Sequence, residues 1–192
     1  MKTKYIILAA ILMVLAGHSF AKAELPTHCK PSLGKISKEK GESIILAHKM
    51  GHHIIQTMIS KDRLQSNATA MVYEVLADYY SASLRNDPDL QIRKMDQKTS
   101  FDLVKNDFYS AGHPLRYILW SLRKKLGASG DLDQAIHKTT RFWGNSDLRY
   151  KNDAKKETWK KMTMDYLDHL RLNLQDSERG VLDKVMEEVD LY

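Results

Sequence analysis

The fold is decided by the stretch Pro114–Gly127, which reads PLRYILWSLRKKLG. Its apolar residues recur every three or four positions, the spacing that gathers them on one face of an α-helix. Pro114 suits the first position of a helix, where the N–H has no intrahelical partner, and Gly127 suits the residue that ends one. The stretch therefore predicts an amphipathic helix that buries Leu115, Ile118, Leu119, Leu122 and Leu126.

The same spacing continues on both sides of this helix. The expected helices span 37–59, 68–84, 101–111, 114–126, 131–143, 154–174 and 177–189, and residues 90–98 are expected to form a surface connection. In the 68–84 helix, Val72, Val75 and Tyr79 share the apolar face, so Glu74 and Ser81 should point away from it. No segment alternates as a strand would. The sequence therefore predicts an all-α protein with a single compact helical domain of six or seven helices over residues 37–192, which needs no metal or disulfide to fold.

The first residues carry the three parts of a secretory signal peptide. Lys2 and Lys4 precede an apolar run, and Ala21 and Ala23 form an A-x-A cleavage site before Glu24. The apolar run is shorter than the roughly 20 residues that a membrane-spanning helix needs. We expect a signal peptide at residues 1–23, an extended arm at 24–36, and a mature chain that is exported to the periplasm or secreted and is not transmembrane.

The sequence excludes several classes of site. One cysteine allows neither an internal disulfide framework nor a C-x-x-C zinc or redox motif, and leaves Cys29 for an intermolecular disulfide. G-x-S-x-G, P-loop and dinucleotide-binding patterns are absent. We therefore nominate no catalytic residue and favour a protein that is not an enzyme.

A histidine cluster, HKMGHH at positions 48–53, is the first candidate site. His48 and His52 are four residues apart, so one helix face offers both imidazoles, whereas His53 points to the opposite side. Lys49 stands where zinc peptidases of the H-E-x-x-H type carry their glutamate, so this activity is not supported. Gly51 allows a neighbouring helix to come close.

Two interpretations of this histidine pair stay open. In the structural one, each imidazole meets a carbonyl, a tyrosine or an acid of a neighbouring helix. In the functional one, His48 and His52 hold a transition metal, or one of them holds a haem. The candidate further ligands are Asp165 and His169, with Glu74, Asp78, His113 and His137 as alternatives.

A basic, aromatic-rich region is the second candidate site. Residues 113–161 contain 12 basic and 5 acidic residues. The predicted anion-binding residues are Arg141, Lys155, Lys156, Lys160 and Lys161, with Trp143 and Trp159 beside them. Alternatively, the charges form an ordinary solvated face, or pair with the acidic last helix through residues such as Asp183 and Glu188.

Three functions follow from these features, in order of preference. The first is an exported binding or accessory protein that recognises a protein partner or an anionic envelope component, with no nucleic acid expected outside the cytoplasm. The second is a helical protein that binds a metal or haem through His48 and His52. The third is a small envelope hydrolase.

Overall fold

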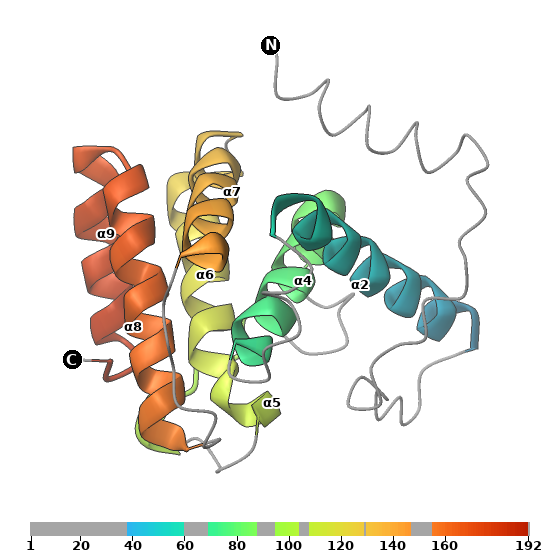
Figure 1. The fold of residues 1–192 in the computed structure, drawn as a ribbon, viewed down its shortest axis with the longest axis horizontal. Helices are drawn as coiled ribbons and strands as arrows, with labels where there is room; N and C mark the ends of the chain where they lie inside the picture. Colours follow the sequence, from blue (N-terminus) through green and yellow to red (C-terminus); the bar gives the residue numbers. More distant parts are fainter. Residues whose placement is uncertain are drawn as a thin grey trace. The chain divides into compact units, whose positions relative to one another are not determined.

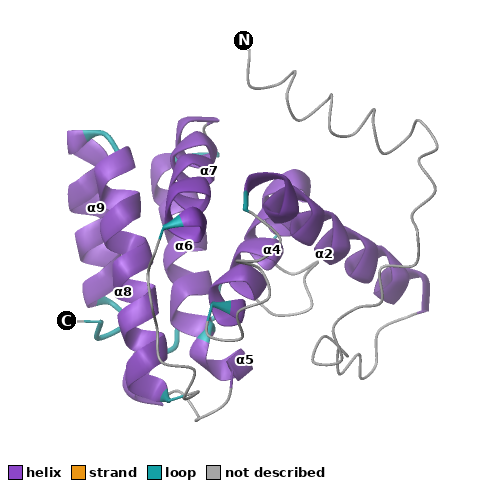
Figure 2. Ribbon diagram, in the orientation of Figure 1, coloured by secondary structure: helices purple, strands orange, loops and turns teal. Residues whose placement is uncertain are grey.

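The computed structural model describes residues 38–59, 69–87, 95–103, 108–128, 130–146 and 155–191. Within these ranges the chain forms helices and no strand (Figures 1 and 2). The long helices are α2 (Lys38–Met58), α4 (Ala70–Arg85), α6 (His113–Leu126), α7 (Gly130–Asn145), α8 (Lys156–Asn173) and α9 (Asp176–Glu187). The predicted all-α domain is confirmed, and Lys35–Tyr192 form one compact unit. The expected signal peptide, the expected arm at 24–36 and Cys29 lie outside the described residues.

Helix α4 is the central helix of this unit. It packs most extensively against α2 (Figure 1) and also contacts α6, α8 and the short helix α5 (Phe108–Ala111). Every residue from Met71 to Ala82 is buried, because neighbouring helices cover α4 on more than one side. The expectation that Glu74 and Ser81 point away from the core is therefore wrong, since they are 2% and 0% exposed. This position of α4 brings acidic side chains into the interior.

The remaining long helices pack as two pairs. Helix α6 packs against α9, and α7 packs against α8. Helix α6 has Pro114 in its first turn and is followed by Gly127 with φ of 79°, as its sequence predicts. Its predicted apolar face is confirmed for Leu115, Ile118, Leu119 and Leu122, which are fully buried, whereas Leu126 at the end of the helix is half-buried.

The crossing of α2 and α4 requires a residue without a side chain. A Cβ atom on Gly51 would lie 2.2 Å from the carbonyl oxygen of Ala77 in α4. Gly144 of α7 also leaves room for a close contact. A Cβ atom there would lie 2.4 Å from Cδ1 of Ile59, just beyond the end of α2. The two glycines let α2 approach both neighbours closely.

A buried polar cluster joins α4 to α6 and α7. The hydroxyl of Tyr79 donates to Oδ1 of Asp133 at 2.7 Å, and Nη1 of Arg123 donates to the same oxygen at 2.7 Å. Burial, followed by the charge of Asp133, raises the pKa of Tyr79 well above its usual value of 10.0. The tyrosine is therefore a neutral hydrogen-bond donor to the half-buried Asp133 carboxylate.

Some predicted connections and boundaries differ from the structure. The expected 101–111 helix is instead a short 3₁₀ helix, η2 (Phe101–Leu103), and a short helix, α5 (Phe108–Ala111), while residues 104–107 lie outside the described residues. The N–H of Phe101 donates to the carbonyl oxygen of Val189 at 3.1 Å, which ties η2 to the C-terminal segment. Met95, in the predicted surface connection, is fully buried. In the described part of the chain, no helix is long and apolar enough to cross a membrane.

Candidate metal centre

Helix α2 places His48 and His52 on the side that packs against α4. His48 is 1% exposed, whereas the side chain of His52 is 22% exposed and forms the rim of the site. His53 is exposed on the other side of the helix. The helical register predicted from the spacing of the histidines is therefore confirmed.

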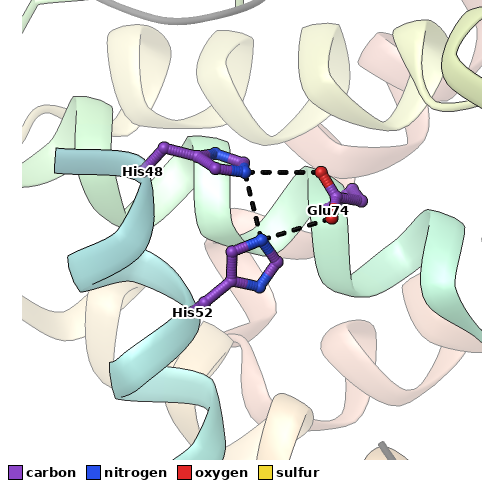
Figure 3. Close-up of side chains that lie close together, drawn as sticks. All are labelled: His48, His52 and Glu74. Carbon is purple, nitrogen blue, oxygen red and sulfur yellow. Dashed lines mark hydrogen bonds and ion pairs between the residues drawn. The ribbon is translucent and has the colours of Figure 1, made fainter. Parts of the chain in front are cut away.

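Glu74 of α4 brings its carboxylate to both imidazoles (Figure 3). Nε2 of His48 lies 3.0 Å from Nε2 of His52 and 3.4 Å from Oε2 of Glu74, and Nε2 of His52 lies 3.2 Å from Oε1 of Glu74. A tetrahedral zinc ion with bonds of about 2.0–2.1 Å separates its ligand atoms by about 3.3–3.4 Å. The two nitrogens, and each nitrogen with its nearer carboxylate oxygen, therefore already lie near the separations that one bound ion requires.

A second acid and an arginine lie behind His48. Nδ1 of His48 lies 2.9 Å from Oδ1 of Asp78, and Nε of Arg116 donates to Oδ2 of the same carboxylate at 2.7 Å. Asp78 and Arg116 are 0% and 1% exposed. Because an ionised carboxylate repels a nitrogen lone pair and attracts an N–H, this contact favours a proton on Nδ1 and leaves Nε2, which faces Glu74, unprotonated and able to bind a metal ion.

The other ligands suggested from the sequence lie elsewhere. Asp165 and His169 of α8 are outside the metal-capable group that the described residues form. Nδ1 of His169 lies 2.6 Å from the backbone oxygen of Asp165, and its ring contacts Phe142 of α7. Glu74 and Asp78, the alternatives on the 68–84 helix, are the acids that meet the histidines. The histidines do meet acids, as the structural interpretation predicts, and the geometry of those acids also suits an ion.

The basic region is assembled differently from the prediction. Arg141, Lys155 and Lys161 are exposed, and Lys156 and Lys160 are half-buried. Trp143 and Trp159 are only 2% and 4% exposed, so the expectation that they border an accessible surface is wrong. The ring of Trp143 packs edge-on against Tyr166, which shows that these aromatic rings fill the core between helices.

The acidic last helix pairs with part of the basic region. Glu188, the residue that ends α9, accepts hydrogen bonds from the hydroxyl of Tyr117 at 2.6 Å and from Nζ of Lys125 at 2.9 Å. These two bonds, the one from Tyr117 first, hold the pKa of Glu188 below its usual value of 4.5. Asp183 forms an ion pair with Arg171 of α8. The acidic helix thus neutralises basic groups of both α6 and α8.

The donor set narrows the chemistry of the histidine site. Two imidazoles and one carboxylate form the ligand set of several catalytic zinc sites, and imidazole also suits copper, nickel and iron. Comparison of the chain with protein-family models, curated proteins and solved structures gives no match. What the site does must follow from its donor atoms and their surroundings.

Proposed function

We propose that this chain is an exported helical protein that binds a divalent transition-metal ion, with Zn²⁺ as the best fit, through His48, His52 and Glu74. One observation carries the proposal: His48, His52 and Glu74 of two helices bring one ligand atom each within 4.8 Å of one another, the two imidazole nitrogens lie 3.0 Å apart, and each nitrogen lies 3.2 or 3.4 Å from one oxygen of the Glu74 carboxylate. The close crossing at Gly51 and the carboxylate behind His48 support it, because both hold the donors in place.

The chemistry of the donors favours zinc over other ions and over haem. Magnesium and calcium prefer oxygen ligands, and copper(I) prefers sulfur. Haem iron already has four porphyrin nitrogens and needs one or two axial ligands. Three side-chain donors within 4.8 Å of one another suit a single small ion better than a flat macrocycle. Copper(II), which binds nitrogen and oxygen sites more strongly than zinc, is the competitor to measure.

Calorimetric titration of tag-free protein, stripped with a chelator, tests this function. The wild-type protein should bind one Zn²⁺ per chain, and the double variant His48→Ala/His52→Ala should lose that binding. Glu74→Gln should weaken it, because an amide is a poorer metal ligand than a carboxylate. His53→Ala is the matched control, since His53 is exposed on the opposite side of α2. Equal loss from His53→Ala would contradict the proposed ligand set.

Binding of an anionic envelope surface, or of an acidic protein partner, is the second candidate function. It is supported by the exposure of Arg141, Lys155 and Lys161 on α7 and at the start of α8. Replacement of Lys155, Lys156, Lys160 and Lys161 by glutamate should reduce binding to vesicles of anionic lipid. Wild-type binding should also weaken between 0.1 M and 1 M salt, as the Debye length falls from about 10 Å to about 3 Å. Unchanged binding in both comparisons would rule out binding of this region to an anionic lipid surface.

Export is the part of the proposal that rests on the N-terminal sequence alone. The charged start, the apolar run and the A-x-A site are typical of a cleaved signal peptide. N-terminal sequencing of the protein from its native compartment should give Glu24 as the first residue. Recovery of Met1 from a membrane fraction would contradict export in this form.

A further inference from the structure

A chain of buried polar contacts leads from the metal ligands into the centre of the helical unit. It begins at Nδ1 of His48 in α2, which lies 2.9 Å from Oδ1 of Asp78 in α4. It continues from Oδ2 of Asp78 to Nε of Arg116 in α6 at 2.7 Å, and from Nη1 of Arg116 to the backbone oxygen of Tyr109 at 3.2 Å. The two oxygens of Asp78 are therefore divided between the histidine and the arginine.

We propose that Asp78, oriented by Arg116, is the positioning residue of the metal centre. This inference rests on the proposed function and adds to it the group that makes His48 a ligand. A neutral imidazole carries one proton, and it coordinates a metal only through the other nitrogen. With its Oδ1 only 2.9 Å from Nδ1, the Asp78 carboxylate favours the proton on that nitrogen, and so keeps Nε2 of His48 unprotonated and aimed at the position between His52 and Glu74.

Arg116 determines which atom of the residue-78 side chain faces His48. Its guanidinium only donates hydrogen bonds, so residue 78 must turn an oxygen toward it. Gly112 leaves room for this group, since a Cβ atom there would lie 2.9 Å from Nη1 and 3.2 Å from Cζ of Arg116. The alternative is that Asp78 and Arg116 form a buried ion pair with no role at the metal. An amide in place of the Asp78 carboxylate separates the two interpretations.

Asp78→Asn is the first variant of the test. The amide has one oxygen, which Arg116 requires, so its NH₂ group turns toward Nδ1 of His48. Nδ1 must then accept a hydrogen bond, which moves the imidazole proton to Nε2 and removes His48 as a ligand. Zinc affinity, measured by competition with a chromophoric chelator, should fall about 10–100-fold, the range typical for loss of such an outer partner.

The double variant Asp78→Asn/Arg116→Met should recover part of that affinity. Without the guanidinium, the amide of residue 78 is able to turn its oxygen toward His48, which restores the proton to Nδ1. Arg116→Met alone measures what loss of the guanidinium itself does to zinc affinity, and the double variant is compared with it. If Asp78 and Arg116 form only a structural ion pair, the double variant should bind zinc no better than Asp78→Asn. That result would overturn the inference.

Nitrogen-15 NMR of the histidine rings in metal-free protein provides a second readout that needs no zinc. The ring of His48 should carry its proton on Nδ1 in the wild-type protein and on Nε2 in Asp78→Asn. A wild-type ring protonated on Nε2 would overturn the inference even if no variant folds. Wild-type protein that binds no zinc would overturn the proposed function, and with it any role of Asp78 at a metal. Equal zinc affinity in the wild type and Asp78→Asn would overturn only the role of Asp78.

Discussion

Replacing Gly51 by alanine should separate α2 from α4 and weaken the metal centre. The new Cβ would lie 2.2 Å from the carbonyl oxygen of Ala77 and 2.8 Å from its Cα. These are backbone atoms of a buried helix, so no side chain is able to turn aside. To reach ordinary contact distance, α2 must move away by about 1 Å at this point.

The expected size of the effect comes from two opposing contributions. Overpacking of a well-packed interior destabilises by about 1–3 kcal/mol, and a contact with rigid backbone belongs in the upper part of that range. Alanine is favoured over glycine within a helix by about 1 kcal/mol, which offsets part of this loss. We therefore expect Gly51→Ala to lower the free energy of unfolding by about 1–2 kcal/mol.

Gly180→Ala is the matched control for this prediction. Gly180 lies inside α9, and a Cβ atom there meets nothing within 4 Å. This variant should gain up to about 1 kcal/mol from helix propensity alone, so the two alanine variants should differ by about 2–3 kcal/mol in urea titrations. The zinc affinity should fall in Gly51→Ala and stay unchanged in Gly180→Ala. Equal stabilisation by both variants would refute the close approach of α2 to Ala77.

Three further predictions test the metal, the buried cluster and the surface pair. Zinc at 100 times its dissociation constant should stabilise the protein by about 2.7 kcal/mol, and a chelator should abolish that gain in thermal melts; an unchanged melting temperature would contradict zinc binding to the folded chain. Tyr79→Phe should cost about 1–2 kcal/mol in urea titrations, because Asp133 loses a buried hydrogen-bond donor, and a neutral result would contradict that bond. The folded state holds the pKa of Glu188 below its usual value of 4.5, so its bond to Tyr117 stabilises above that pH and is lost as the pH falls through the lowered pKa. The difference in free energy of unfolding between wild type and Glu188→Gln should therefore be below about 1 kcal/mol near neutral pH and vanish in acid. A difference that grows in acid would contradict the lowered pKa of Glu188.

The sequence predicts a helix boundary well where the backbone preference of a single residue sets it. The start of α6 follows from the fixed φ of Pro114, and its end follows from the positive φ that Gly127 adopts without strain. The burial of a helical residue depends less on its neighbours in sequence and more on which other helices pack against it. In α4, periodicity marks one apolar face, but it does not reveal that other helices cover the remaining sides. Glu74 and Ser81 are buried because of that coverage, which no pattern within 68–84 contains.

The site shows the same division between local and tertiary information. The pairing of His48 and His52 is local, because positions four apart share a helix face. The third donor, Glu74, depends on where α4 crosses α2, and Gly51 is the one sign of that crossing within the sequence. The error at Trp159 has another cause. Trp159 lies on the same helix face as Met162, which already predicts that it is buried. The expectation of an exposed surface came only from the number of lysines nearby.

The energetics of the crossing between α2 and α4 favour a functional reason for its charged residues. Glu74, Asp78 and Arg116 are at most 2% exposed, and taking such groups out of water opposes folding. Apolar side chains of similar volume at such positions are often neutral for stability, or stabilising by about 1–4 kcal/mol. Stability alone therefore does not explain why the crossing between α2 and α4 holds Glu74, the Asp78–Arg116 pair and two histidines. The metal binding proposed for His48, His52 and Glu74 would supply such a reason, because an ion that binds only the folded state adds stability that grows with the concentration of free metal.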